Sequence, residues 1–539
     1  ASGPSLGAGD LVVAQEDDAA EPEQISAEVV PTEWTGVTRN VPGDYPTIQA
    51  GVDAADPGDL VLVGPGVYKE AVQVVTPGIT LRGTDRNEVI LDGEFTRDNG
   101  VFVVADGVAV ENMTARSYMV NGFFWSGVTG YRGSYLTSVD NRVYGIYPFD
   151  SVDGLIEYSY ASGSDDGGYY IGQCENCRAV LTDSVAERNG MAYSGTNSSG
   201  EIFIVNNVFR DNQSGVVPNT LDSELYPPVN SVYVGGNLII DTGQPVEEVP
   251  FNNVAWAPRG TGVALFGSVG SLIEKNTIIN SMSSGVLIQT MIDNNVWPAT
   301  DNVVRDNVII GSGRADVTFG GPAASGNCVD QDGASTVPAL ATWTATCDGL
   351  NLPMPWGLGG GSEPLGRFVE YAKDAVDSIP HGAAADPELD FDSLPVDAPV
   401  VPAVDVFDTY GFDVSTVSAP PIPGGTIEND RHLVILGIDT TLDWWPLYSG
   451  MLLWWLPVLV WVVGGIWALM RAWGREASTA EKVVWTLLIV LLPVIGIFLF
   501  ALIGNRDAPA TNRWLASWTM LIAWVVAVYL LFAPLFARA

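Results

Sequence analysis

The chain has 539 residues and a formal net charge of −39, from 63 acidic and 24 basic residues. Neutralising phosphates requires clusters of Lys and Arg, and the sequence contains none, so we expect no nucleic-acid partner. With only two histidines, histidine catalysis and His-ligated zinc are also poorly supported.

Residues 1–39 are small and acidic and show no apolar periodicity, which predicts a flexible N-terminal segment. No signal peptide is visible in this segment. Because the features described below place the body of the protein outside the cell, we expect a signal peptide to have been removed before Ala1.

Residues 40–321 contain short β-rich segments in a recurring register. A short amphipathic helix over Thr47–Ala55 precedes them and ends at Pro57 and Gly58. Glycines then recur at spacings of 23, 23, 22 and 25 residues, at Gly122, Gly145, Gly168, Gly190 and Gly215. A small polar residue also recurs before an apolar one, at Asn112, Ser138, Ser159, Ser184, Asn207, Asn237, Asn276 and Asn307. Three strands per coil, with these polar residues stacked in a hydrogen-bonded ladder, predict an all-β parallel solenoid.

The segment YPTIQAGVDAADPGDLVLVGPGVYKEAV resembles the first coil of right-handed parallel β-helix proteins. That broad group includes pectin-lyase-like enzymes and NosD-like copper-maturation proteins. The resemblance implies a right-handed parallel β-helix whose open end is capped by the short helix. It covers about half of the chain, and it is specific for the fold but weak for function.

Carboxylates and arginines of consecutive coils are the candidate catalytic residues. If the protein is an enzyme, they are Asp165, Asp166, Glu187, Arg188, Arg210 and Asp211, within an acidic cluster that also holds Asp183, Asp222 and Glu224. Paired carboxylates act as acid and base in glycosidases, and Asp165 and Asp166 could instead bind calcium. Glu187 and Arg210 are one coil apart, as are Arg188 and Asp211. We therefore favour structural pairing between coils over a ligand groove and over catalysis.

Aromatic residues recur close to the coil glycines, at Tyr118, Phe123, Phe124, Trp125, Tyr144, Tyr147, Phe149, Tyr169, Tyr170 and Tyr193. We expect most of them to fill the core. Those that face outward would form a strip for stacking sugars or docking a partner. Adjacent strand residues face opposite sides, so either Tyr169 or Tyr170 should be exposed or lie in a turn.

The four cysteines form two close pairs in the sequence. Cys174 and Cys177 have a C-x-x-C spacing, which fits a disulfide, a soft-metal site or a redox pair. Thiols outside the membrane tend to oxidise, so we favour a disulfide that closes a turn, with copper binding as an alternative. Cys328 and Cys347 predict a second disulfide across the loop between them.

Residues 322–443 contain this second disulfide and then predict a Gly- and Pro-rich extended spacer. Within residues 444–539, three uncharged segments are long enough to be transmembrane helices: Leu447–Met470, Val483–Ile503 and Trp514–Phe536. Basic residues in the loop Arg471–Lys482 place that loop and the C-terminus in the cytoplasm, which leaves the large N-terminal domain outside the cell.

The segment VVWTLLIVLLPVIGIFLFALIGNR is similar to the two-helix membrane module that precedes phospholipase D-type catalytic domains. The H-x-K-x-x-x-x-D motif of those enzymes is absent, and the only histidines are His381 and His432. The resemblance therefore implies a membrane module without phospholipase activity.

Together these features favour a multi-pass protein of the cell membrane. Its extracellular β-helix would act as a non-enzymatic binding or scaffold subunit of a cell-envelope or membrane-protein complex. One alternative is a cell-surface polysaccharide lyase or glycoside hydrolase, which would make polysaccharide a partner. Another is a NosD-like copper-site maturation factor. No cofactor is predicted, and calcium and copper are the open alternatives.

Overall fold

The structure is a computed structural model that divides into two compact units, which are described separately: residues 1–334 with 342–429, and residues 335–341 with 430–539. It describes residues 36–243, 258–320, 326–351 (without 332, 338–340 and 350), 391–423 (without 402), 432–441 (without 436 and 437), 453–505 (without 492), 509, 512–514, 517–519 and 521–524. The predicted flexible segment 1–35, most of the predicted spacer and the end of the third apolar segment lie outside these residues.

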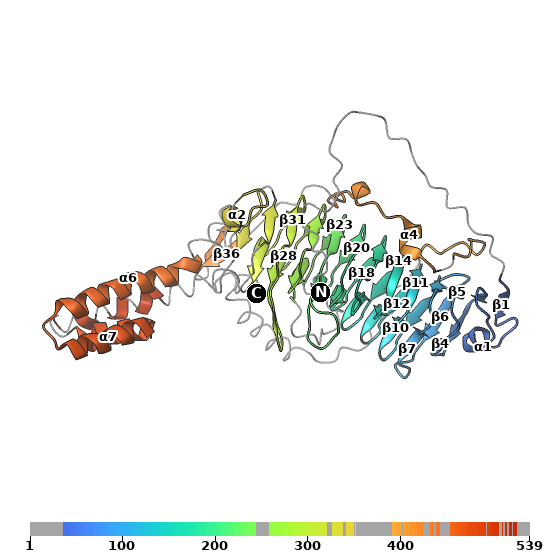
Figure 1. Cartoon of the computed structure of the whole chain (residues 1–539), viewed down its shortest axis with the longest axis horizontal. Coiled ribbons are helices and arrows are strands. Elements are labelled where there is room, and N and C mark those ends of the chain that lie inside the picture. Colours follow the sequence, from blue (N-terminus) through green and yellow to red (C-terminus); the bar gives the residue numbers. More distant parts are fainter. Residues whose placement is uncertain are drawn as a thin grey trace, which may run out of the picture. The chain divides into compact units, whose positions relative to one another are not determined.

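The first unit is a parallel β-helix with three sheets, in which strands of successive coils pair in parallel (Figure 1). Sheet A has twelve strands in the order β1 (Thr38–Val41), β2 (Leu60–Val63), β5 (Thr80–Gly83), β8 (Val108–Glu111), β11 (Thr129–Ser134), β14 (Val152–Glu157), β17 (Ala179–Thr182), β20 (Ile202–Val205), β23 (Val232–Gly235), β26 (Leu272–Glu274), β31 (Val303–Arg305) and β34 (Cys328–Asp330). Sheet B has ten, in the order β3 (Gly66–Tyr68), β6 (Val89–Asp92), β9 (Thr114–Arg116), β12 (Thr137–Val139), β15 (Tyr160–Ser162), β18 (Val185–Glu187), β21 (Val208–Arg210), β24 (Leu238–Ile240), β27 (Thr277–Ile279) and β32 (Val308–Ile310). Sheet C runs through β4 (Val72–Val74), β7 (Asn99–Val103), β10 (Asn121–Ser126), β13 (Tyr144–Phe149), β16 (Gly167–Tyr170), β19 (Met191–Thr196), β22 (Ser214–Asn219), β25 (Val263–Phe266), β28 (Ser284–Gln289) and β33 (Ala315–Gly320). The predicted parallel β-helix is confirmed.

The periodic residues of the sequence form rows inside the β-helix. In sheet C, Phe123, Ile146 and Tyr169 share one register and are fully buried. The recurring polar residue forms a buried ladder in which the Nδ2 of Asn207 donates to Asn237, that of Asn237 to Asn276 and that of Asn276 to Asn307, over 2.9–3.1 Å. These amides satisfy one another and neighbouring carbonyls, so their burial carries no unpaired polar group.

The predicted helix is α1 (Ile48–Asp53), with Thr47 as its N-cap. The Thr47 hydroxyl accepts a hydrogen bond from the Ala50 amide over 3.1 Å, which satisfies one of the free donors of the first turn. Ile48 and Val52 are buried on the face that packs against the first coils. The helix therefore covers the end of the core, as the resemblance implied.

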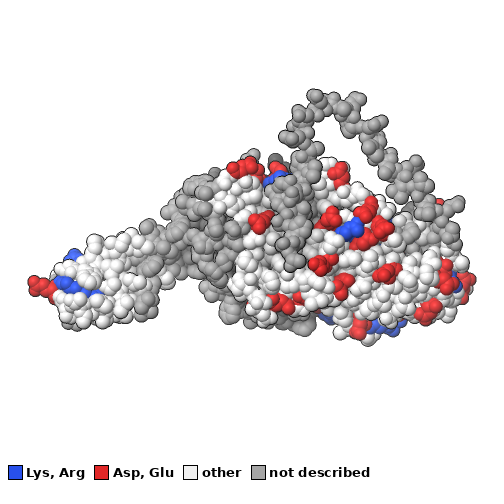
Figure 2. All heavy atoms as spheres, viewed as in Figure 1, with Lys and Arg blue, Asp and Glu red and all other residues white. Residues whose placement is uncertain are grey.

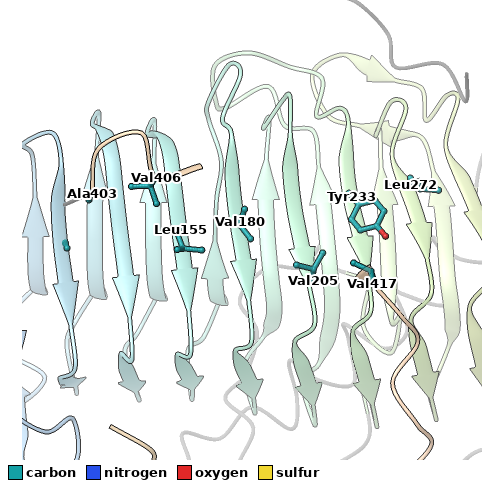
Figure 3. Packing of buried hydrophobic residues seen from close by; sticks show 9 residues of the cluster. Leu155, Val180, Val205, Tyr233, Leu272, Ala403, Val406 and Val417 are labelled. Carbon is teal, nitrogen blue, oxygen red and sulfur yellow. The ribbon is translucent and has the colours of Figure 1, made fainter. Parts of the chain in front are cut away.

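Part of the predicted spacer lies along the outer face of sheet A. Residues 391–423, called the strap here, include α4 (Val406–Tyr410) and the short helix η1 (Val414–Thr416). Figure 3 shows Val406 and Val417 of the strap beside outward-facing residues of sheet A; the buried cluster comprises Ala109, Leu155, Val180, Val205, Tyr233, Leu272, Ala403, Val406 and Val417. Arg82 donates to the carbonyls of Ala398 and Pro399, over 2.7 and 3.0 Å. The strap is extended as expected but is bound to the β-helix along its length.

The second unit contains the hairpin β36 (His432–Ile435) and β37 (Ile438–Thr441), and β35 (Thr336–Val337) also falls in it. Its helices are α6 (Leu453–Gly474), α7 (Thr479–Leu491), α8 (Pro493–Leu499) and the π-helix η3 (Phe500–Gly504); the short α2 (Ala341–Thr344) lies where the two units meet in sequence. The helices pack around Ala468, Ile489 and Phe500. Within the part of the chain that the structure describes, no helix has both the length and the apolar character needed to cross a membrane. The three predicted membrane spans stay a prediction.

Candidate functional site

Four aromatic residues stand in a row on the outer face of sheet C. Phe102, Phe124 and Tyr147 share one register on β7, β10 and β13, and adjacent rings stack with their centroids 4.8 Å apart. Tyr170 of β16 continues the row and meets Tyr147 edge-on at 4.7 Å. We call these four residues the aromatic strip. The first three are partly exposed, whereas Tyr170 is fully buried.

Strand alternation explains why the strip faces outward. Phe123, Trp125 and Tyr169 are sequence neighbours of strip residues, and all three are fully buried in the core. Tyr169 and Tyr170 thus face opposite sides, as predicted. The prediction that one of them is exposed or in a turn is wrong, because the loop after β22 covers Tyr170.

That loop brings Glu224 onto the end of the strip. The Tyr170 hydroxyl donates to Glu224 Oε2 over 2.5 Å. A Cβ at Gly172 would lie 2.5 Å from the same hydroxyl, so the glycine leaves room for this contact. At β13 the aromatic surface is wider, because Tyr144 and Phe149 lie 4.3 and 5.6 Å from the Tyr147 ring.

Two carboxyl groups at the end of the strip have strongly raised pKa values. Burial raises the pKa of Asp166 to about 7, assisted by the charge of Asp165 and opposed by a hydrogen bond from Tyr144. Burial also raises the pKa of Glu224 to about 7, opposed by the Tyr170 hydroxyl and assisted by the charge of Asp166. Groups that change protonation near neutral pH can act as general acids or bases.

The surroundings of these carboxyls are fixed by polar contacts. Asp165 lies 3.8 Å from the guanidinium of Arg142. Asp222, two residues before Glu224, accepts hydrogen bonds from the backbone and side chain of Asn295 and from the Trp297 indole, over 2.7 to 3.1 Å. Trp297 belongs to the hairpin of β29 (Met291–Ile292) and β30 (Val296–Trp297). The hairpin therefore anchors the loop that carries Glu224.

The other candidates from the sequence lie in or just after sheet B strands. Arg210 Nε donates to Glu187 Oε2 over 2.5 Å between adjacent coils, and the Tyr160 hydroxyl also donates to Glu187. Arg188 lies 3.6 Å from Glu187. Burial raises the pKa of Asp211, as do the charges of Asp241 and Glu187, while Arg210 and Arg188 lower it. The register pairing suggested for Glu187 and Arg210 is present.

Both predicted disulfides are present. Cys174 and Cys177 are bonded in the loop between β16 and β17, with their Cα atoms 5.2 Å apart, and Cys328 is bonded to Cys347. In this oxidised state Cys174 and Cys177 offer no thiolate, which removes the ligands on which the copper alternative relied. Among the residues that the structure describes, no group of three or more His, Cys, Asp or Glu side chains is placed to hold a metal ion.

Phe102 and Arg142 were not among the residues predicted from the sequence, nor was the contact between Tyr170 and Glu224. The first omission was avoidable, because Phe102 precedes Phe124 by one coil, as Phe124 precedes Tyr147. The contact between Tyr170 and Glu224 joins residues 54 positions apart through an irregular loop. No repeat in the sequence indicates that contact.

Comparisons with known proteins find a family-model match within the second unit and structural likenesses for the β-helix. No curated protein matches the chain. The A-module of mannuronan C-5 epimerase AlgE4 from Azotobacter vinelandii is 17% identical, covering 53% of this chain and 90% of its own, with a TM-score of 0.40. The catalytic unit of a GH87 α-1,3-glucanase from Streptomyces thermodiastaticus is 15% identical over 57% and 67%, with a TM-score of 0.39. Residues 465–505 match the phospholipase D-nuclease N-terminal family, which supports the predicted resemblance of this C-terminal module.

Proposed function

We propose that the β-helix is a glycan-binding domain that holds a polysaccharide on the aromatic strip. The observation that carries the proposal is the strip itself: three partly exposed rings in register that lead to Tyr170, Glu224 and Asp166. Ligand sites in proteins typically combine aromatic surface with a few converging polar groups whose pKa values are perturbed. The end of the strip has this composition.

The orientation of the rings favours a ligand rich in oxygen. Phe124 is stacked between Phe102 and Tyr147, with interplanar angles of 20° and 16°, so its neighbours cover its faces and its edge is what remains exposed. The edge of an aromatic ring is electropositive. Glycan hydroxyl oxygens can contact such edges and can also pair with the nearby carboxyl groups.

We also propose that the chain is anchored in a membrane by its C-terminal region, with the β-helix on the extracellular side. The match of residues 465–505 and the three uncharged segments support this proposal. Alkaline carbonate washing of membranes from expressing cells should leave the full chain in the pellet. Protease added to intact cells should degrade the β-helix, and release of the chain by carbonate would contradict the anchor.

Binding to glycans can be tested on the full chain in mild detergent, by affinity electrophoresis through gels that contain single polysaccharides. Retardation of the wild type that Tyr147→Ala weakens by about tenfold would support the strip as the site, since that change removes a stacked ring. Tyr158→Ala is a matched control, because Tyr158 is also exposed and stacked, on Tyr135. Equal loss in both variants, or retardation by no polysaccharide, would count against the proposal.

A glycoside hydrolase is the second candidate, favoured by the raised pKa values of Asp166 and Glu224. Release of reducing ends from a bound glycan would reveal it. Asp166→Asn and Glu224→Gln should each abolish the release, while Asp211→Asn should not. A glycan that is bound but never cleaved by the wild type would leave the protein as a binding module.

A further inference from the structure

The charged groups around the end of the aromatic strip are mainly acidic. Asp165, Asp166 and Glu224 lie there. The charge of Asp165 raises the pKa of Asp166, and the charge of Asp166 raises the pKa of Glu224. The guanidinium of Arg142 is held by Asp165 and lies 5.0 Å from the centre of the Phe95 ring. On the face of the β-helix seen in Figure 2, acidic side chains are likewise more widespread than basic ones.

We infer that the strip selects glycans without acidic groups, such as neutral glucans or N-acetylated hexosamine polymers, and rejects polyuronates. This inference rests on the proposed glycan-binding function and specifies its substrate class. It also separates the two enzymatic alternatives that the sequence left open, because lyases act on uronate polymers whereas hydrolases act on neutral ones as well.

Like-charge repulsion is the first argument. The charge of Asp166 already disfavours the charged form of Glu224, and the charge of Asp165 disfavours that of Asp166. Oδ1 of Asp166 is enclosed without a hydrogen-bond partner among the described residues. A third carboxylate, supplied by a uronate sugar, would add to this repulsion in a partly desolvated place. Arg142 offers little compensation because Asp165 lies within ion-pair distance of it and because its side chain is 55% exposed, so water screens its charge.

Hydrogen-bonding capacity is the second argument. A sugar hydroxyl both donates and accepts, so it can pair with Asp166 or Glu224 in either protonation state. A uronate carboxylate only accepts, so it can pair only with the protonated acids. The other ionisable groups facing the pair are Asp165, Tyr144, Tyr147 and Tyr170. The three tyrosines stay neutral because burial raises their pKa values.

The third argument concerns chemistry. Lyases remove the proton beside a sugar carboxylate, and the resulting carbanion forms only when that carboxylate is neutralised by a cation or a proton donor. At the end of this strip the nearby cation, Arg142, already lies within ion-pair distance of Asp165. The carboxyl groups of Asp166 and Glu224 lose their protons near pH 7. Protonation of a glycosidic oxygen by a carboxylic acid requires no such neutralisation.

The test compares a neutral β-1,3-glucan hexamer and an N-acetylglucosamine hexamer with a galacturonate hexamer, by calorimetric titration of the full chain in mild detergent. At pH 8 and 0.1 M salt we expect at least one neutral hexamer to bind about tenfold or more tightly than the uronate. At pH 5.5 the difference should shrink, because Asp166 and Glu224 are then protonated. The double variant Asp166→Asn, Glu224→Gln should show the small difference at both pH values, and its melting curve verifies that it is folded.

Uronate binding as tight as neutral binding at pH 8, weakened by Tyr147→Ala, would overturn the inference while leaving the proposed glycan-binding function standing. Binding of no hexamer, together with no retardation in any polysaccharide gel, would remove both. Neutral binding that Tyr147→Ala leaves unchanged would place the site elsewhere and also overturn the inference.

Discussion

The outer faces of sheets A and C differ in their side chains and in whether the chain covers them. On sheet A the outward-facing Leu155, Val180 and Val205 are aliphatic, and the strap covers them (Figure 3). On sheet C the corresponding surface of β7, β10 and β13 is aromatic, and Phe102, Phe124 and Tyr147 remain partly exposed. The protein thus covers one apolar face with its own chain and leaves another accessible.

This difference indicates which face is available to a ligand. The strap forms hydrogen bonds with its face in addition to apolar contacts, since Asp153 accepts from the amides of Val406 and Phe407 over 3.2 and 3.0 Å. These two amides belong to the first turn of α4, where amide groups lack partners within the helix. Sheet A is therefore a structural interface within the chain, and sheet C is the better candidate for binding.

The largest expected effect comes from the buried ion pair under the strap. Arg82 and Glu111 are almost fully buried and their charged atoms lie 2.6 Å apart, and Arg82 also donates to two strap carbonyls. Arg82→Ala should lower the free energy of unfolding by about 3 kcal/mol, because one oxygen of the buried Glu111 carboxylate and two strap carbonyls lose their donor, while Arg132 stays paired with the other Glu111 oxygen. Urea unfolding followed by circular dichroism measures this. A loss below about 1 kcal/mol would mean that the strap does not depend on this contact.

Introducing a charge on the buried side of the strap should release it. Val406 is 5% exposed within the cluster, whereas Val404, two residues earlier, is 58% exposed. Val406→Asp should cost about 2 kcal/mol of unfolding free energy and should make residues 391–423 sensitive to protease. Val404→Asp is the matched control and should do neither. Equal protease resistance of both variants would contradict the described packing.

The contrast between the two faces also explains what the sequence could predict. The Asn ladder and the Glu187–Arg210 pair follow the coil period, so residue spacing was enough to find them. The strap does not follow that period, since the Asn87 side chain donates to the Phe391 carbonyl across 304 residues. The Pro-rich composition of the strap also resembles that of a free linker. Glu224 reaches Tyr170 from an irregular loop. Spacing therefore predicted the fold and the Glu187–Arg210 pair, but not the covering of sheet A or the end of the strip.

The two carboxyl groups at the end of the aromatic strip should make the stability of the protein depend on pH. The pKa values of Asp166 and Glu224 are raised in the folded state, from 3.8 and 4.5 to about 7. Between these values the folded protein binds more protons than the unfolded chain, so their contribution to stability is present below about pH 4 and is lost as pH rises to 7. Asp166→Asn should therefore stabilise the protein at pH 8 by roughly 1–2 kcal/mol, after allowance for partial exposure. It should have little effect at pH 4.

Melting temperatures across this pH range would measure the effect. Asp306→Asn is a suitable control, since the Asp306 side chain is 69% exposed. This change should have little effect on stability at pH 4 and at pH 8. A melting temperature of Asp166→Asn that falls below that of the wild type at pH 8 would show that the carboxylate is stabilised in the folded state. The candidate site would then lack a group that titrates near neutral pH.

The smallest effect is expected for an ion pair that no strap covers. Glu187 and Arg210 lie as close as Arg82 and Glu111, but the Arg210 side chain is 51% exposed. Water already solvates much of Arg210, and Glu187 keeps its contacts with Tyr160 and Arg188 after the change, so Arg210→Ala should cost less than about 1 kcal/mol. Urea unfolding of this variant beside Arg82→Ala isolates the effect of the strap, because both substitutions remove an arginine that pairs between adjacent coils. Similar losses in the two variants would mean that contact geometry, and not covering by the strap, sets the strength of these pairs.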